Sequence, residues 1–385
     1  MTEINTEKRI HKSHYLRLNV IKNDQYRAVN LISGKQFVLD DGAVEVLEYY
    51  RKPRQFESSV VDSIAVKRLL EKELLVYEDH NELNQFTLSN DTLFGVKQFN
   101  RTVDDSVVFL GVPFGLGNGY DQGTGKFPQY YRGVLKSRNF KLRNEITNPL
   151  ALNLKSSALP IDNLYDAGNI YFNSAETQEQ RYDKITKLIT ELGSNIPFTI
   201  GGDHSITFPV ARALNKRYRD FAVVHLDAHT DIYTSDFDQL YKSNRIHHHG
   251  NFVSHCLELE GLSGYYQYGI RGLSTIFQDL SNDKLKVSWT SDVKKRDISF
   301  NVKEEKIYLT IDIDAFDPSI APATATPVAN GLNMNDFDYI LDHIGFNKER
   351  VIGIDIVEIN PQKDQEKRTL DLCTELIVKL LNRLS

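Results

Sequence analysis

The chain has 385 residues, of which 41% are hydrophobic and 25% charged, and this composition is typical of a soluble globular protein with two domains. Its net charge of −6 is spread over interspersed acids and bases, which argues against general affinity for nucleic acids or membranes. Two cysteines cannot build a disulfide framework and favour a reducing compartment. No signal-like apolar core opens the sequence and no stretch approaches membrane-spanning length, so we expect a cytoplasmic protein.

Residues 1–80 are predicted to form a small separate domain. Apolar and polar residues alternate in three short segments, which we interpret as strands at 15–20, 26–32 and 36–39. Helical spacing follows Asp40 and Asp41, which can cap a helix, and recurs over 60–74. This order predicts a small α+β domain of winged-helix-like type. Residues 81–104 are mostly polar and are predicted to be a linker.

Residues 105–385 alternate between apolar strands and amphipathic helices. We expect strands at 107–112, 196–200, 221–225, 266–270, 307–313 and 351–357. We expect helices at 176–192, 206–219, 334–345 and 366–383. This alternation predicts an α/β domain with a mainly parallel sheet and helices on both faces. In such sheets, functional sites gather at the carboxyl ends of the strands.

The segment Leu226-Asp227-Ala228-His229-Thr230-Asp231 closes one of these predicted strands. Side chains alternate faces in an extended segment, so Asp227, His229 and Asp231 should point the same way. Two carboxylates and one imidazole on one face suit a cation. The alternative is a polar strand end with solvated acids, and this motif alone does not decide between the two.

Polar residues also close three other predicted strands. In Gly201-Gly202-Asp203-His204-Ser205 the glycines allow a sharp turn that presents His204, although this histidine could instead cap the next helix. Asp312 and Asp314 share a face at the end of another apolar strand. Burying these acids is too costly without a compensating positive charge. Glu358 closes a strand that is too apolar to lie at the surface.

These strand ends together offer a set of mixed oxygen and nitrogen ligands: His204, Asp227, His229, Asp231, Asp312 and Asp314. The set is too large for one structural zinc, which prefers four ligands and often takes sulfur. It suits two hard or borderline divalent ions, with manganese the natural choice for carboxylate and imidazole. Two ions roughly 3.5–4 Å apart can activate water at neutral pH. We therefore predict two manganese ions per chain.

Four motifs occur in one order along the chain: Gly-Gly-Asp-His-Ser, Asp-Ala-His-Thr-Asp, Asp-Ile-Asp-x-x-Asp-Pro and Asp-Ile-Val-Glu-Ile-Asn-Pro. Together they resemble the ureohydrolase family of arginase and agmatinase, over residues 105–385. The resemblance implies an arginase-like three-layer fold and a homo-oligomer. It implies that one metal is bound by His204, Asp227, Asp231 and Asp312, and the other by Asp227, His229, Asp312 and Asp314.

The resemblance also implies catalytic roles. Glu358 would accept hydrogen bonds from a guanidinium group, and Asp314 would relay a proton to the leaving amine. A histidine in a His-Gly motif would shuttle protons, and His249 matches best, although His247 and His248 are adjacent. The alternative for this histidine run is a solvated or incidental metal-binding loop. The products would be urea and a primary amine.

Two positions differ from arginases that use free arginine. Such enzymes place an asparagine two residues after the last aspartate of Asp-Ala-His-Thr-Asp, where this chain has Tyr233, which we treat as a substrate-binding candidate. They also follow a Gly-Leu-Arg segment with acids, whereas Arg271 is followed here by Gly272-Leu273-Ser274. A site without these partners predicts a substrate without a free amino-acid head group. That leaves agmatine, other alkylguanidines or arginine within a peptide.

The N-terminal domain favours the peptide. Its segment Leu-Ile-Ser-Gly-Lys-Gln-Phe-Val-Leu resembles the recognition element of enzymes that modify ribosomally made peptides, which binds a leader peptide as an added strand. The combination resembles peptide arginases and predicts conversion of arginine residues of a precursor peptide to ornithine. Two alternative functions remain open, a small-molecule agmatinase-like enzyme and an arginase-fold deacetylase. The domain could also be an oligomerisation or lid domain.

Overall fold

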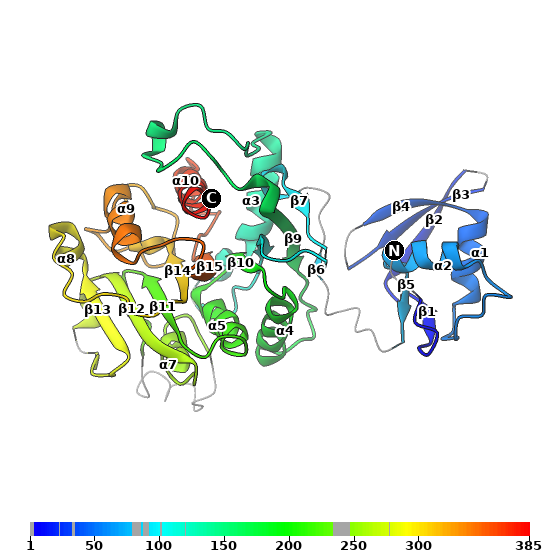
Figure 1. Cartoon of the computed structure of the whole chain (residues 1–385), viewed down its shortest axis with the longest axis horizontal. Helices are drawn as coiled ribbons and strands as arrows, with labels where there is room; N and C mark the ends of the chain where they lie inside the picture. Colours follow the sequence, from blue (N-terminus) through cyan, green and yellow to red (C-terminus); the bar gives the residue numbers. More distant parts are fainter. Residues whose placement is uncertain are drawn as a thin grey trace. The chain divides into compact units, whose positions relative to one another are not determined.

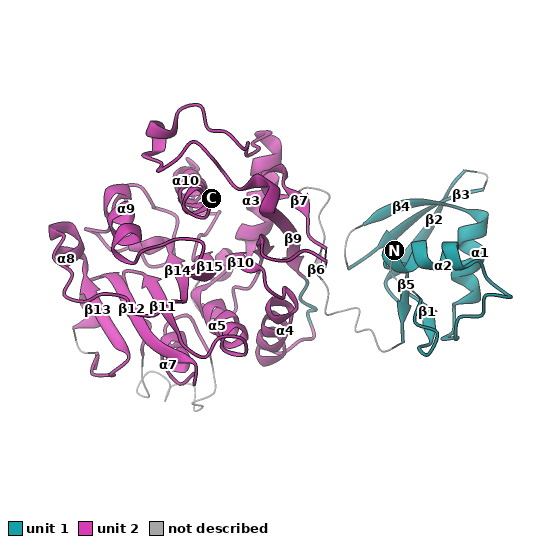
Figure 2. Cartoon of the chain, viewed as in Figure 1, with its two compact units in different colours: residues 1–90, 171–174 teal, residues 91–170, 175–385 magenta. Residues whose placement is uncertain are grey.

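The computed structural model describes residues 4–22, 24–32, 35–78, 86–87, 92–100, 102–119, 121–233, 247–276 and 278–385. The chain divides into two compact units (Figure 2). Unit 1 comprises Met1–Asn90 with Tyr171–Ser174, and unit 2 comprises Asp91–Ile170 with Ala175–Ser385. Within the described ranges, no helix is long and apolar enough to cross a membrane.

Unit 1 contains the three expected strands, followed by the two expected helices. The strands β2 (Leu16–Lys22), β3 (Gln25–Asn30) and β4 (Gln36–Asp40) form an antiparallel sheet. The helices are α1 (Asp41–Tyr49) and α2 (Ser63–Glu71), and β1 (Ile10–Lys12) pairs with β5 (Leu75–Tyr77). The Asp40 carboxylate accepts a hydrogen bond from Ala43 N at 2.9 Å, which confirms the expected cap. Buried side chains such as Leu47, Tyr50 and Val66 give the unit its own core.

Unit 2 is built on a parallel sheet. Its strands run in the order β13-β12-β11-β14-β15-β10-β8-β9, and each neighbouring pair is parallel. Their bounds are β8 Val107–Gly111, β9 Leu164–Ile170, β10 Ile196–Ile200, β11 Phe221–Leu226, β12 Leu262–Ile270, β13 Leu285–Trp289, β14 Ile307–Asp312 and β15 Val351–Val357. Strands β9 and β13 were not expected from the sequence, because they carry polar residues within short segments.

Helices cover both faces of this sheet (Figure 1). One face shares a buried cluster with α3 (Phe127–Ser137), α9 (Met334–His343) and α10 (Arg368–Arg383). The opposite face carries α4 (Gln178–Glu191), α5 (Thr207–Asn215) and α7 (Phe252–Leu257). The three-layer α/β fold is therefore confirmed. The remaining short elements are β6 Phe86–Thr87, η1 Leu93–Gly95, β7 Lys97–Gln98, η2 Gln122–Lys126, η3 Pro149–Leu152, η4 Ile161–Asn163, η5 His204–Ile206, η7 Leu273–Thr275, α8 Thr290–Lys295 and η8 Ile313–Ala315.

The second half of the expected linker 81–104 differs from that expectation. Leu93 and Phe94 are buried in the core of unit 2, and β7 pairs with β9. Leu93 N also donates to the buried carboxylate of Asp166 at 2.6 Å. The apolar residues here are few and separated by polar ones, so composition alone indicated a linker.

Candidate metal centre

The predicted site residues lie at the carboxyl ends of four strands that are neighbours in the sheet, in the order β11-β14-β15-β10. Asp227 follows β11, Asp312 ends β14, Glu358 follows β15, and His204 begins η5 after β10. Because the four strands are parallel, these residues meet at one edge of the sheet. All four are buried.

The local backbone is a set of turns rather than the extended segment that we expected. Strand β11 ends at Leu226, the Asp227 carboxylate accepts the backbone N–H of His229 at 2.5 Å, and Asp231 adopts a φ of 48°. Asp312 likewise accepts the N–H of Asp314 at 2.8 Å and so begins η8. The carboxylates thus cap their own turns, and the side chains converge by turning rather than by strand alternation.

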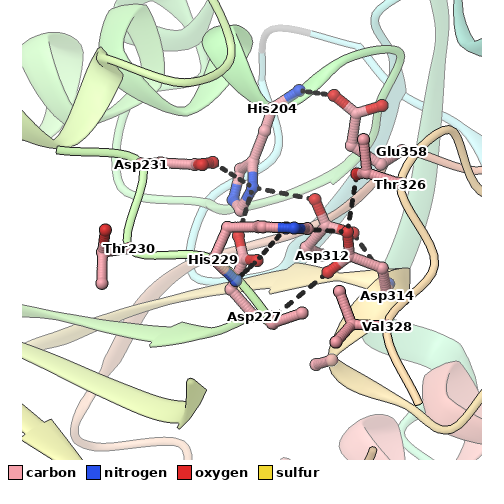
Figure 3. Close-up of polar contacts among 12 residues, drawn as sticks. His204, Asp227, His229, Thr230, Asp231, Asp312, Asp314, Thr326, Val328 and Glu358 are labelled. Atoms are coloured by element: carbon pink, nitrogen blue, oxygen red, sulfur yellow. Dashed lines mark hydrogen bonds and ion pairs between the residues drawn. The ribbon is translucent and has the colours of Figure 1, made fainter. Parts of the chain in front are cut away.

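The side chains form two adjoining clusters that share Asp227 (Figure 3). In the first, His204 Nδ1 lies 3.0 Å from Asp227 Oδ2, 3.2 Å from Asp312 Oδ2 and 3.5 Å from Asp231 Oδ2. In the second, His229 Nδ1 lies 3.5 Å from Asp227 Oδ1 and 3.2 Å from Asp314 Oδ2. Asp227 therefore offers a different oxygen to each cluster, as a carboxylate that bridges two cations would. All six predicted ligands are brought together.

The hydrogen bonds behind His204 fix the orientation of its ring. The Thr310 hydroxyl donates to Asp355 at 2.5 Å, so its oxygen accepts from His204 Nε2, which lies 2.9 Å away. Nδ1 then faces the carboxylates, and this buried nitrogen has no hydrogen-bond partner among the described residues. The carboxylates favour a positive charge at Nδ1, which a proton supplies when no metal is bound and which a metal ion supplies when it displaces that proton. The residues present therefore fit a metal ion.

The pKa values of the cluster also indicate a shortage of positive charge. Burial, followed by repulsion from neighbouring carboxylates, raises the pKa of Asp231 and Asp312 well above their ordinary values. Burial also opposes ionisation of Asp227, but the close histidine side chains hold its pKa well below its usual range. Burial lowers the pKa of His204, yet the carboxylates around it raise it well above its ordinary value. A divalent cation would relieve this repulsion.

His225 lies in the first cluster but is not free to bind a metal. Its Nε2 is 2.8 Å from Asp227 Oδ2, and its Nδ1 is 3.1 Å from Gln267 Nε2. The Gln267 amide nitrogen also donates to Thr230 O at 2.7 Å, which fixes the amide orientation and makes His225 Nδ1 an acceptor. His225 Nε2–H therefore donates to Asp227. Burial lowers the pKa of His225 to about 4, so the ring is neutral at pH 7.

Glu358 and His249 form a second pair of charged side chains at the site. Glu358 has a φ of 62°, its Oε1 accepts from His204 N at 2.9 Å, and His249 Nδ1 lies 3.5 Å from the same oxygen. Burial lowers the pKa of His249, but Glu358 outweighs it and raises the value to about 9. His247 instead packs against Phe208, away from this pair.

Tyr233 lies beside the His249–Gly250 turn. Its backbone N–H donates to Gly250 O at 3.0 Å. Its ring packs so closely on Gly250 that a Cβ added to this glycine would lie 2.7 Å from Tyr233 Cδ2. The ring therefore flanks the segment that carries His249.

The buried groups behind the ligands were not predicted from the sequence. They are His225, which holds Asp227, and Thr310 with Asp355, which orient His204. A signal was present, because His225 and Thr310 each precede a ligand by two residues in a buried strand and so share its face. Asp355 accepts hydroxyl donors from Thr207 and Tyr308 as well, which no sequence pattern indicated.

Comparison with known proteins adds to this geometry. Residues 105–382 match the model of the Arginase family. Agmatinase from Bacillus subtilis is 28% identical over 229 residues, covering 57% of this chain and 74% of that protein. The mitochondrial guanidino acid hydrolase of Homo sapiens is 30% identical over 294 residues, covering 71% and 76%. Among solved structures, proclavaminate amidino hydrolase from Streptomyces clavuligerus shares the fold, with a TM-score of 0.63, 24% identity and coverage of 77% and 97%. The chain therefore belongs to the arginase family, whose members are hydrolases that act on guanidino C–N bonds.

Proposed function

We propose that this protein hydrolyses a small guanidine without a free α-amino-acid head group, such as agmatine, to urea and a primary amine. The observation that carries this proposal is the second oxygen of Glu358. Glu358 Oε2 is buried beside the ligand cluster and has no hydrogen-bond partner among the described residues. A buried, unpaired carboxylate oxygen is costly, and a guanidinium group supplies the planar, charged donors that would satisfy it.

The roles of the side chains follow from their contacts. His204 N–H holds Glu358 Oε1, which leaves Oε2 to accept from the guanidinium group and so to orient its central carbon at the ligand cluster. When bound, the metal pair would supply activated water. Asp314 is held by Ala228 N at 3.1 Å and by the Thr326 hydroxyl at 3.1 Å, which fixes it to pass a proton to the leaving amine. His249, whose side chain is 24% exposed, can exchange protons with solvent.

We propose two manganese ions as the metal, because the ligands are carboxylates and imidazoles without sulfur. One ion would be held by His204, Asp227, Asp231 and Asp312, and the other by Asp227, His229, Asp312 and Asp314. The participation of His204 and Asp231 in the cluster argues against the arginase-fold deacetylase, which would need one zinc. Elemental analysis of the purified protein tests this, since one metal per chain would favour the deacetylase.

The small substrate is supported by the names of the relatives, an agmatinase and a guanidino acid hydrolase. It is also supported by the segment after Arg271, where Gly272-Leu273-Ser274 offers no acid for an α-amino group and Leu273 is exposed. The second candidate is arginine within a precursor peptide. One observation favours it: residues 1–104 lie outside the family match, and unit 1 carries an antiparallel sheet with β2 and β4 at its edges. An edge strand can bind a leader peptide by strand addition.

Urea release separates these candidates. The full-length protein, loaded with Mn²⁺, would be given agmatine, a guanidino acid, free arginine and an arginine-bearing leader–core peptide. We expect the highest kcat/KM for a small guanidine, and loss of turnover in Asp314→Asn. Preference for the peptide would support the second candidate, and preference for free arginine would contradict the missing head-group contacts. No urea from any of them would refute guanidine hydrolysis. The expected homo-oligomer and cytoplasmic location stay predictions, and light scattering tests the first.

A further inference from the structure

Arg271 is bound almost entirely to main-chain carbonyl groups. Its Nη2 donates to the carbonyl oxygens of Asp314 at 2.8 Å, Val328 at 2.8 Å and Phe316 at 3.4 Å. Its Nη1 donates to those of Ala315 at 3.1 Å and Gly269 at 3.0 Å, and its Nε to that of Ala329 at 3.1 Å. One guanidinium thus joins the end of β12, the turn η8 and the loop 328–329.

These carbonyl groups need an external donor. The last carbonyl groups of a short helix have no partner within it, and η8 spans only Ile313–Ala315. Arg271 satisfies the carbonyl groups at this end, and its fork of donors reaches several at once, which a lysine ammonium cannot reproduce. The loop packs closely against both this guanidinium and the chain after η8, because a Cβ on Gly331 would lie 2.4 Å from Asp317 N, 2.5 Å from Phe316 C and 2.7 Å from Arg271 Nη2. The Arg271 backbone N–H adds a bond to Ala228 O at 2.9 Å.

The segments that Arg271 joins carry one side of the metal centre. Asp314 belongs to η8, and its Oδ2 lies 3.2 Å from His229 Nδ1. Thr326, which donates to the same oxygen, precedes the loop that Arg271 holds through Val328, and Figure 3 shows Val328 beside Asp314. Ala228 lies between the ligands Asp227 and His229. No described bond of Arg271 reaches the segment that carries His204, and its one bond to the segment of Asp231 is the bond to Ala228, three residues before that aspartate.

We propose that Arg271 is a positioning residue for the metal subsite of Asp227, His229 and Asp314, and that its fork sets the affinity of this subsite more than that of the subsite around His204. The inference rests on the metal assignment of the proposed function. It concerns binding of the metal and not turnover, so the two can fail separately.

The experiment is titration of the full-length protein, stripped of metal, with Mn²⁺ alone by calorimetry, with elemental analysis of the loaded protein. Wild type is expected to bind two ions. Arg271→Met and Arg271→Lys should weaken one of them roughly tenfold or more and leave the other nearly unchanged. Arg350→Met is the matched control, because Arg350 also donates to main-chain carbonyl groups, those of Ile344, Val302 and Glu304, near the amino ends of β14 and β15. This control should lower the melting temperature and bind both ions normally.

Unchanged affinity for both ions in Arg271→Met, or the same selective loss in Arg350→Met, would overturn the inference. Equal weakening of both ions would overturn it as well. If Arg271→Met does not fold, Arg271→Lys decides the inference, because it keeps the side-chain stem and the charge but loses the fork of donors. Normal binding of both ions by Arg271→Lys would then overturn the inference. Wild type that binds two ions but releases no urea would refute the proposed function and leave the role of Arg271 standing.

Discussion

Replacing Glu358 by glutamine removes the charge that we assign to guanidinium binding and keeps the shape of the side chain. It also removes the carboxylate that raises the pKa of His249. The glutamine Oε1 can still accept the His204 N–H, which now lies 2.9 Å from Glu358 Oε1. The amide nitrogen would then replace the unpaired Oε2 and meet the N–H donors of the substrate with a donor of its own. A hydrogen bond to a charged group contributes about 1.5–3 kcal/mol, and the deep burial of Glu358 together with the donor–donor contact favours the upper value. About 3 kcal/mol corresponds to a loss of roughly a hundredfold in kcat/KM.

The assay for Glu358→Gln is urea release over a range of guanidine concentrations, with manganese content measured on the same sample. The matched control is Glu349→Gln, which makes the same substitution at an exposed position just before β15, near the amino end of that strand. We expect Glu358→Gln to retain its metal and its melting temperature while kcat/KM falls, and Glu349→Gln to match wild type. Near-normal kcat/KM in Glu358→Gln would show that this carboxylate does not bind the guanidinium group. Loss of metal in this variant would show that Glu358 supports the metal centre instead.

Three further results are expected. Removing the metal with a chelator should lower the melting temperature in scanning fluorimetry, since each ion at a hundredfold excess over its Kd stabilises the folded state by about 2.7 kcal/mol; an unchanged melting temperature would contradict metal binding by the native protein. His225→Phe removes the N–H that donates to Asp227 at 2.8 Å and should weaken Mn²⁺ binding roughly 10- to 100-fold in calorimetry, whereas wild-type affinity would show that this bond is dispensable. Arg132→Met leaves Asp166 buried without its cation and should lower the free energy of unfolding by about 3 kcal/mol, the lower end of the usual range because two backbone N–H groups still donate to this carboxylate. Denaturant titration measures that loss. In the control Arg138→Met, which breaks an exposed ion pair, the free energy of unfolding should change by less than about 1 kcal/mol.

Most of the sheet could be predicted because its central strands are continuous apolar runs. Strands β10, β11, β14 and β15 are almost wholly buried, and their lengths and boundaries agree with the expected ones to within about a residue. Strand β9 was missed because it holds Asp166 and Asn169, which look like surface residues in the sequence. Both are buried and bonded to Arg132, a partner distant in the chain that no local pattern identifies. The Asp166 carboxylate also accepts a hydrogen bond from Leu93 N and so anchors part of the expected linker.

The gathering of the candidate ligands could be predicted because burying several acids and histidines together at strand ends is costly unless they bind a cation. The turns that carry these residues could not be predicted. Asp227 and Asp312 accept the backbone N–H groups of the residues two positions later, and these bonds turn the chain. Arg271 was noticed only for the residues that follow it. Its role depends on carbonyl groups of segments more than forty residues away, and a sequence does not reveal the positions of carbonyl groups.

The residues behind the ligands suggest how a strand-end metal site is stabilised. A ligand that ends a buried strand has the residue two positions earlier directly beneath it on the same face. Here those residues are His225 beneath Asp227 and Thr310 beneath Asp312, and each donates or accepts a hydrogen bond within the site. Apolar residues at these positions would remove the bond of His225 to Asp227 and that of Thr310 to the His204 ring, and ligands that are held less firmly bind a metal less tightly. A polar residue two positions before a strand-end ligand therefore indicates such a site, because burying a polar side chain in an apolar strand costs free energy unless the side chain has a partner there.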